Sequence, residues 1–482
     1  MTQTGNAAPG IYESPHPPIS TFLPSQQSSY QLSNYLPLHS HTPPSNLNST
    51  LPPCHLGYFN LKWTMRYPRI SGKIQSRFML KLLTNFRGPK FNRTNILKMS
   101  SVPYKQPEHK LTMIPGPIEF SDEVLYAMAT PSQAHTSPEF IKTFQSALVN
   151  LRKLFKSTDA KAQPFVLSGS GTLGWDIFAT NFVNAGDKVL VLSTGFFSDS
   201  FAECMKVYDL DVDVETADIG DVVSLSKIEE KLKSGSYKAI TITHVDTSTS
   251  VVSDVKAISE LVKKVSPETL IIVDGVCSIG VEDLEFDKWG VDYALTASQK
   301  AIGVPAGLSI SFASARAMDI ALNRSKDTSF FASVKRWTPI MKAYESGSGA
   351  YFATPAVQTV TALKVALDQI LSEPLDQRFA KHAESSDKFK GDLEKIGLKI
   401  LPVNKQVAAH GLTAVYFPES INGPDLLGKL ATKGFTVAGG IHKALPGKYF
   451  RVGHMSHSVY EGHLDLLFPA IKESLLELGY SS

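Results

Sequence analysis

The 482-residue sequence has little cysteine and no long apolar run. Its three cysteines, Cys54, Cys204 and Cys277, lie far apart and form no CxxC pair. A disulfide scaffold or a cysteine-rich zinc site is therefore not expected, and a reducing compartment is favoured. Because no stretch of about 18 uninterrupted apolar residues occurs, the sequence predicts no membrane span. We expect neither a metal site nor binding to a membrane.

Acidic residues are almost missing from the first 107 positions. This segment carries 11 Lys/Arg and a single acid, Glu13, whereas the rest of the chain has 37 Lys/Arg and 44 acids. The overall net charge of +3 therefore hides a basic N-terminal segment and a mildly acidic main body. A globally basic surface is absent from the main body, so nucleic acid is not an expected partner.

The basic N-terminal segment, residues 1–107, is predicted to lie outside the folded domains. Residues 1–55 are rich in Pro, Ser, Asn and Gln and contain no Lys or Arg, which predicts disorder. Residues 56–100 are basic and free of acids, a composition that fits a mitochondrial transit peptide. This stretch does not begin at Met1, so an internal start such as Met99, or a start codon set too early, stays open. We expect a cytoplasmic or mitochondrial protein, with no peroxisomal signal at the C-terminus.

Regular α/β alternation begins near Lys110. Short, apolar, β-branched runs separated by amphipathic stretches predict a largely parallel sheet with helices on both faces. The predicted strands are PFVLS (164–168), KVLVLS (188–193), AITITHV (239–245), TLIIVDGV (269–276) and YALTAS (293–298). After a predicted helix, VQTVTALKVALDQIL, the pattern changes to a long helical stretch followed by short strands. We therefore predict a large domain over 108–370 and a smaller α+β domain over 371–482.

A glycine-rich turn, GSGTLG, follows the first predicted strand and precedes a helix. It matches the GxGxxG pattern, but a Rossmann site also needs an acid at the end of the next strand to hold a ribose. That strand ends in Ser193, Thr194 and Gly195, so a nicotinamide dehydrogenase is disfavoured. The turn still suits a phosphate, because Gly171 and Thr172 open a helix. A tight strand-to-helix turn without a ligand is the alternative.

Two charged residues follow predicted buried strands. Asp274 ends TLIIVD, and Lys300 follows YALTASQ before a turn rich in Gly and Pro. Strand ends of this kind face the crevice in which α/β folds bind ligands. A lysine for a Schiff base, a buried acid for a pyridine nitrogen and a helix start for a phosphate are what pyridoxal 5′-phosphate requires. Taken singly, Asp274 is more typical of a cap or a turn, and Lys300 is also typical of a snorkelling side chain. The combination of the two with the phosphate-binding turn favours the cofactor.

Six segments, in this order, resemble the class V, fold type I, pyridoxal-phosphate-dependent aminotransferases. They are GSGTLGWD, STGFFSD, THVDTSTS, VDGVCSIG, TASQKAIGVPAGL and YFRVG, and the resemblance covers about 110–482. The most similar group is that of the alanine–glyoxylate and serine–pyruvate or serine–glyoxylate aminotransferases, its fungal members above all. The resemblance implies the fold type I architecture, a large domain with a mostly parallel sheet flanked by helices and a smaller α+β C-terminal domain.

The resemblance also assigns roles to individual residues. Lys300 and Asp274 match the catalytic lysine and the partner of the pyridine nitrogen. The expected cofactor contacts are Ser170, Gly171, Thr172, Phe197, Ser248, Val276 and Gln299, with Tyr351 and Thr354 reaching the cofactor of a partner subunit. Thr172 stands where many relatives have His. Phe197 stands where many relatives have Trp, so the side chain at this position keeps a π-face but lacks the indole N–H donor.

For the substrate, the resemblance implies that Arg451 grips the carboxylate and that Gly116 borders the pocket. A guanidinium matches a carboxylate with two parallel hydrogen bonds. The implied partners are a small amino acid, a 2-oxo acid and a second copy of the chain, which completes each site in a homodimer. The implied reaction moves the amino group of alanine to glyoxylate. Serine as donor stays open, and a non-catalytic binding protein or a desulfurase is the weaker alternative.

Overall fold

The computed structural model describes residues 104–481. The disordered segment and the transit peptide that the sequence predicts fall almost wholly within residues 1–103 and lie outside the described residues. The description begins at Tyr104, seven residues before the first strand, β1 (Leu111–Thr112).

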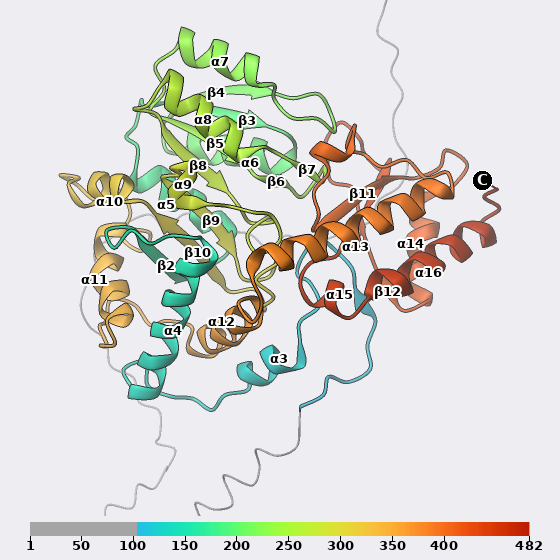
Figure 1. Cartoon of the computed structure of the whole chain (residues 1–482), viewed down its shortest axis with the longest axis horizontal. Coiled ribbons are helices and arrows are strands. Elements are labelled where there is room, and N and C mark those ends of the chain that lie inside the picture. The colour runs from blue at the N-terminus through green and yellow to red at the C-terminus, as the bar shows by residue number, and fades with distance from the viewer. Residues whose placement is uncertain (1–103, 482) are drawn as a thin grey trace, which may run out of the picture. The chain divides into compact units, whose positions relative to one another are not determined.

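A seven-stranded sheet with the order β2-β10-β9-β8-β5-β3-β4 forms the centre of the large domain (Figure 1). Strands β9, β8, β5, β3 and β4 pair in parallel, and β10 runs antiparallel between β2 and β9. The mostly parallel sheet that the sequence predicts is therefore confirmed. Its strands are β2 (Gln163–Ser168), β3 (Lys188–Ser193), β4 (Asp211–Thr216), β5 (Ala239–Thr243), β8 (Leu270–Asp274), β9 (Tyr293–Ala297) and β10 (Leu308–Ala313).

All five predicted strands are present within a few residues of their expected bounds, and two strands were missed. Every residue of β5, β8 and β9 is buried, as expected for strands covered on both faces. The missed strand β4 lies at the sheet edge, and its sequence DVDVET is half-exposed and polar. The other missed strand, β10, follows the Lys300 turn directly and closes it as an antiparallel partner of β9.

Helices flank the sheet (Figure 1). α4, α11 and α12 pack together beside β2, α5 packs on β9 and β10, and α6 packs on β3 and β4. Several helices start after a Ser or Asp whose side chain accepts the N–H three residues on, as Ser137 does from Phe140 at 3.2 Å. The large-domain helices are α3 (Asp122–Met128), α4 (Pro138–Leu154), α5 (Gly171–Asn181), α6 (Phe196–Val207), α7 (Leu225–Ser234), α8 (Val255–Val265), α9 (Phe286–Trp289), α10 (Ala315–Leu322), α11 (Val334–Glu345) and α12 (Val357–Ile370).

The C-terminal part of the chain has its own hydrophobic core. One core spans Val124 to Ile370, and another joins Met113 to buried residues between Phe389 and Leu475. Strand β1 lies inside the predicted large domain but pairs with β12. The domain boundaries stay a prediction. The C-terminal elements are α13 (Leu375–Lys395), β11 (Leu412–Tyr416), α14 (Gly423–Thr432), β12 (Phe435–Thr436), β13 (Ala438–Gly439), β14 (Tyr449–Gly453), α15 (His457–Tyr460) and α16 (His463–Glu477), with β11, β14 and β13 in one sheet.

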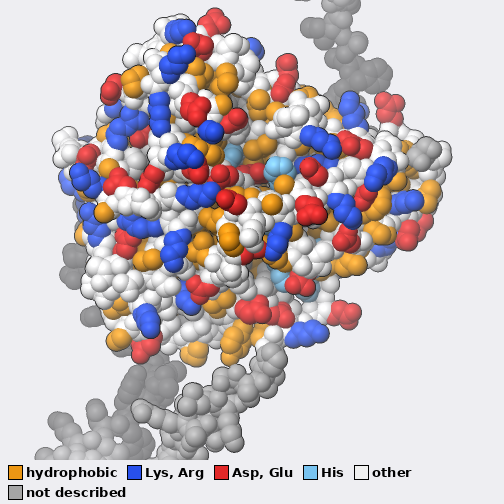
Figure 2. All heavy atoms as spheres, viewed as in Figure 1, with side chains coloured by type: hydrophobic (Ala, Val, Ile, Leu, Met, Phe, Trp, Pro, Cys, Tyr) orange, Lys and Arg blue, Asp and Glu red, His pale blue; other side chains and the backbone are white. Residues whose placement is uncertain are grey.

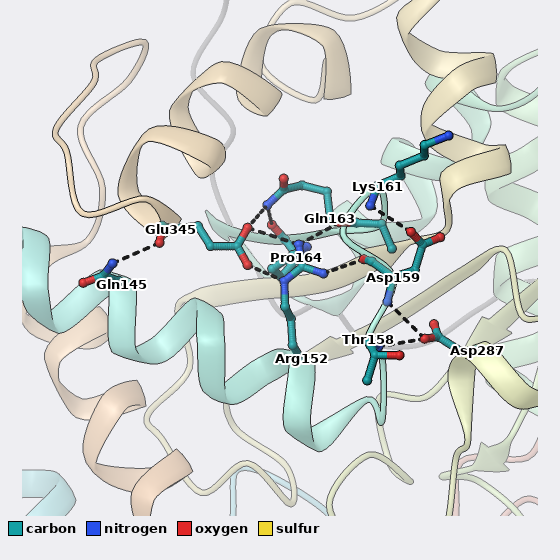
Figure 3. Close-up of polar contacts among 10 residues, drawn as sticks. Gln145, Arg152, Thr158, Asp159, Lys161, Gln163, Pro164, Asp287 and Glu345 are labelled. Atoms are coloured by element: carbon teal, nitrogen blue, oxygen red, sulfur yellow. Dashed lines mark hydrogen bonds and ion pairs between the residues drawn. The ribbon is translucent and has the colours of Figure 1, made fainter.

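One arginine ties three segments together at the start of β2 (Figure 3). Arg152 on α4 pairs with Glu345 at the end of α11 and donates to the carbonyls of Asp159 and Ala162 at 2.9 and 2.7 Å. Gln163 Nε2 donates to the same Glu345 carboxylate at 3.0 Å. These contacts fix the end of β2 opposite to the glycine-rich turn.

Charges of both signs are mixed on the face shown in Figure 2. Lysines and arginines lie among aspartates and glutamates there, with apolar side chains scattered between them. Within residues 104–481, none of the helices is long and apolar enough to cross a bilayer.

The packing of β14 against the N-terminal segment gives a stability prediction. Gly453 N donates to Met113 O at 2.8 Å, and a Cβ built on Gly453 would overlap the Ile114 carbonyl. Because the obstacle is backbone, we expect Gly453→Ala to lower the free energy of unfolding by about 1–3 kcal/mol. Denaturant unfolding measures this change.

The control for that experiment is Gly428→Ala. Gly428 lies inside α14, and a Cβ there would meet nothing within 4 Å. Alanine should leave stability unchanged or raise it by up to about 1 kcal/mol through helix propensity. Equal midpoints for wild type and Gly453→Ala would contradict the close approach of β14 to residues 113–115.

Candidate functional site

The carboxyl ends of β8 and β9 bring Asp274 and Lys300 to one edge of the sheet. β8 ends at Asp274, which pairs in register with Leu295 of β9, and Lys300 follows β9 by three residues. Asp274 is 3% exposed and Lys300 is 8% exposed. Two buried charged groups thus lie at the ends of neighbouring strands, in the part of an α/β fold where ligands bind.

The Asp274 carboxylate is held by N–H donors of its own domain. Trp175 Nε1 donates to one oxygen at 2.8 Å, and Val276 N donates to the other at 3.0 Å. Burial raises the pKa of Asp274 to about 6, although these two hydrogen bonds and the charge of Lys300 oppose the rise. Trp175 was not identified as a site residue from the sequence, although it stands in the quoted motif GSGTLGWD.

The Lys300 amine meets the N-terminal segment of the described chain. Lys300 Nζ donates to the Pro115 carbonyl, and a Cβ built on Gly116 would overlap the lysine side chain. Gly116 has φ +102°, a conformation that favours glycine. The structure therefore brings Lys300 into contact with Pro115 and Gly116, in the segment that the resemblance places at the border of the substrate pocket.

The glycine-rich turn forms the start of α5 beside Asp274. Ser170 is the N-cap of α5 but makes no capping hydrogen bond; its hydroxyl contacts that of Thr172 at 2.7 Å. Both side chains are exposed. A Cβ built on Gly171 would stand 2.8 Å from Val276 Cγ2, so the helix start and the turn after β8 approach closely. The uncapped first turn presents N–H groups and a positive dipole end suited to a phosphate.

Asp246 organises the next loop and was missed by sequence reasoning. Its fully buried carboxylate accepts the N–H groups of Phe197 at 3.2 Å and Ser248 at 2.9 Å, and the Ser248 hydroxyl at 2.6 Å. The Ser248 oxygen in turn accepts Phe196 N at 3.0 Å. Asp246 therefore links Ser248 to the start of α6 and to half-buried Phe197. An aspartate inside the otherwise buried run THVDTSTS was the available sequence indication.

In the described chain, Gln299 has a side-chain oxygen without a hydrogen-bond partner, and Arg451 has a guanidinium without an ion pair. Gln299 Oε1 is buried without a hydrogen-bond partner in the described chain, whereas the Gln299 carbonyl accepts Ile118 N at 3.2 Å. Arg451 on β14 is 8% exposed; it donates to the carbonyls of Gly439 at 3.0 Å and Thr247 at 3.2 Å. Within residues 104–481 it has no ion pair, so a substrate carboxylate would meet an uncompensated guanidinium.

Tyr351 and Thr354 are not brought into this cluster within one chain. Their hydroxyls are 3.4 Å apart, and the Tyr351 ring lies 5.0 Å from that of His135. Tyr351 is 63% exposed. Both residues therefore present hydroxyl groups outward from the segment between α11 and α12.

Comparisons with known proteins agree on one family. A family model described as aminotransferase class-V matches residues 119–458. The chain is 56% identical over 354 residues to alanine–glyoxylate aminotransferase 1 of Saccharomyces cerevisiae, covering 71% of this chain and 91% of that protein. It is 32% identical over 371 residues to serine–glyoxylate aminotransferase of Arabidopsis thaliana, covering 76% and 90% of the two chains. The crystal structure of an alanine–glyoxylate aminotransferase from Nostoc sp. has a TM-score of 0.71 at 27% identity, covering 78% of this chain and 98% of that one.

The environment of Asp274 gives a titration prediction. In the protein without added ligand, we expect the Asp274 carboxyl to take up its proton near pH 6, well above the pKa of an exposed aspartate. Since the folded-state pKa is raised, Asp274 contributes stability that is present below about pH 4 and lost as the pH rises through 6. Carboxyl ¹³C NMR measures the midpoint, with Asp274→Asn to assign the signal. A midpoint near pH 4 would contradict the dominance of burial.

Proposed function

The chain belongs to the class V aminotransferase family, and from that premise we propose that it transfers the amino group of L-alanine to glyoxylate, giving pyruvate and glycine. The fold is that of the fold type I transferases, and the cofactor is pyridoxal 5′-phosphate. The similarity to the yeast enzyme is the observation that supports alanine and glyoxylate. The Arabidopsis relative supports serine as the alternative donor.

The described residues fit the cofactor. The uncapped start of α5 suits its phosphate. The Val276 side chain packs against the bare Cα of Gly171, which brings an apolar surface for a flat ring next to that helix start. Gln299, next to Lys300, has a buried side-chain oxygen without a partner in the described chain, so its amide is available for a hydrogen bond to the cofactor. We assign Ser170, Gly171, Thr172, Phe197, Ser248, Val276 and Gln299 to cofactor binding, and Asp274 to the ring nitrogen.

When bound, pyridoxal 5′-phosphate supplies an aldehyde for an amine and a ring that withdraws electrons from the adjoining carbon. Asp274 supplies the negative charge that keeps a proton on the ring nitrogen, and Trp175 and Val276 hold this carboxylate in place. Lys300 Nζ takes the proton from the Cα of the amino-acid donor and, in the second half of the reaction, gives a proton to the Cα of the 2-oxo acid acceptor. Arg451 binds the substrate carboxylate and so fixes which Cα bond faces Lys300.

We propose a homodimer in which Tyr351 and Thr354 complete the partner subunit's site. Their exposure in the single chain and the resemblance support this assignment. We also propose a cytoplasmic or mitochondrial location, based on the basic, acid-free composition of residues 56–100. The substrates are small amino acids and 2-oxo acids.

The first functional test combines a spectrum with an assay. Loaded with pyridoxal 5′-phosphate, the wild type should show a visible absorption band and form pyruvate from L-alanine and glyoxylate. Lys300→Ala should lose the band and at least about 100-fold in rate, because the lysine carries both the covalent link and the proton transfer. A wild type that stays colourless after loading would contradict the proposal. A higher kcat/KM with L-serine than with L-alanine would make serine the preferred donor.

Lys390 offers the matched control for that lysine. It is also buried, at 4% exposed, and donates to one backbone carbonyl, that of Ala409, at 2.5 Å. It lies on α13, and its described hydrogen bond does not go to a site residue. Lys390→Ala should therefore keep the visible band even where it lowers the melting temperature.

The dimer proposal is tested by complementation. Lys300→Ala chains and chains carrying Tyr351→Ala with Thr354→Ala are expressed together and purified through two different tags. The mixed dimer should regain activity that either pure variant lacks, because one of its two sites then has all three residues. Absence of recovery in the isolated mixed dimer would show that each chain holds a self-contained site.

A further inference from the structure

A second buried arginine, Arg378, joins three segments that follow Asp274, Lys300 and Arg451 in the sequence. Arg378 lies in the first turn of α13 and is 3% exposed. Its Nε donates to the Gly280 carbonyl at 2.7 Å, and Nη2 donates to Ser456 Oγ at 2.9 Å. Nη2 also stands 3.5 Å from the carbonyl of Ala301. Within residues 104–481 Arg378 has no ion pair within 4 Å, so these neutral groups carry its solvation.

Each acceptor lies in a segment that follows a group with a proposed role. Ala301 directly follows Lys300, Gly280 lies in the turn six residues after Asp274, and Ser456 lies five residues after Arg451. The three turns come from distant parts of the sequence, and one planar guanidinium contacts all of them. A rigid fork of five N–H donors suits such a junction, whereas a lysine ammonium is a point charge on a flexible stem.

His382 holds the same junction from the next turn of α13. Its Nδ1 lies 2.8 Å from the Arg378 carbonyl, and its Nε2 accepts Ser456 N at 3.0 Å. Accepting that N–H requires a neutral ring, and burial lowers the pKa of His382 to about 4. Ser456 has φ +51°, an uncommon conformation for serine, and is thus fixed through both its N–H and its hydroxyl.

We propose that Arg378 is a positioning residue that keeps Lys300, Asp274 and Arg451 in mutual alignment for transamination. This inference rests on the proposed function. Arg378 contacts neither substrate nor cofactor in this assignment; it acts through the Ala301, Gly280 and Ser456 turns. Loss of the fork lets the three turns shift independently, and a displacement of about 1 Å at reacting atoms costs up to about 100-fold in rate.

A cavity beside Arg378 makes chemical rescue possible. The cavity holds about 520 Å³, and its lining includes Arg378, Ser456 and Tyr460 together with the acidic residues Glu119, Glu123, Asp368 and Glu461. In Arg378→Ala a guanidinium ion can enter from this cavity and occupy the place of the lost side chain. Urea has nearly the same shape without the charge, so it serves as the matched additive.

The test compares Arg378→Ala and Arg378→Lys with wild type, all loaded with pyridoxal 5′-phosphate. We expect kcat to fall about 10- to 100-fold with a smaller change in KM, and the pH midpoint of the visible absorption to shift. Arg378→Lys should show both effects while its melting temperature stays near that of wild type. Millimolar guanidinium, but not urea, should restore part of the kcat of Arg378→Ala.

The control is Arg152→Ala, which removes another guanidinium that joins several segments (Figure 3). Arg152 acts at the start of β2, roughly 16 Å along the strand from the glycine-rich turn. The Arg152→Ala substitution should lower the melting temperature and leave kcat and the pH profile of the visible absorption unchanged.

Two results overturn the role of Arg378. A wild-type kcat and absorption profile in Arg378→Lys would reduce Arg378 to a structural anchor. Equal losses in Arg152→Ala and Arg378→Ala would assign the effect to stability alone. Failure of the proposed function is distinguishable, because then the wild type itself lacks the band and the transamination.

Discussion

The candidate site depends on burying charged groups of both signs, at the strand ends of the central sheet and on β14, without pairing them with one another. A buried charge is costly unless neighbouring dipoles replace its water. Here the Asp274 carboxylate meets N–H donors, whereas Lys300 and Arg451 meet backbone carbonyls. Neutral dipoles thus satisfy each group and leave its net charge available. In a site built from internal ion pairs, each charge would already be neutralised by its partner and would attract a charged cofactor or substrate less strongly.

Hydrogen bonds to neutral backbone carbonyls also join β14 to the segment that follows β5. Arg451 Nη1 donates to the Thr247 carbonyl, and two residues earlier on β14 the Tyr449 hydroxyl donates to the Ser248 carbonyl at 2.7 Å. Tyr449 also accepts two N–H groups from the loop after β13, beside the Gly439 carbonyl that holds Arg451. The strand carrying the proposed carboxylate-binding group is therefore seated on the segment that carries Ser248. Its position relative to the residues proposed for cofactor binding is set by hydrogen bonds from the Arg451 guanidinium and the Tyr449 hydroxyl to neutral backbone carbonyls.

The sequence predicts those features that follow from local pattern and from the geometry of a parallel sheet. Asp274 and Lys300 end neighbouring buried strands, and parallel strands bring their carboxyl ends to one edge. The partners of these groups were not predictable in this way. Trp175 and Asp246 reach the site through side-chain hydrogen bonds whose directions depend on tertiary packing. The edge strand β4 was missed because exposed alternation in DVDVET carries no apolar run.

The N-terminal segment of the described chain shows why two glycines matter to this arrangement. β1 pairs with β12, the next residue Met113 accepts Gly453 N of β14, and Pro115 accepts Lys300 Nζ. Within a few residues the chain therefore contacts β12, the strand of Arg451 and Lys300. Side chains at Gly453 or Gly116 would separate these contacts, because a Cβ at either position overlaps its neighbour. The bare backbone at Gly116 lets the Lys300 side chain pack directly against it, and a larger residue there would displace the Lys300 amine.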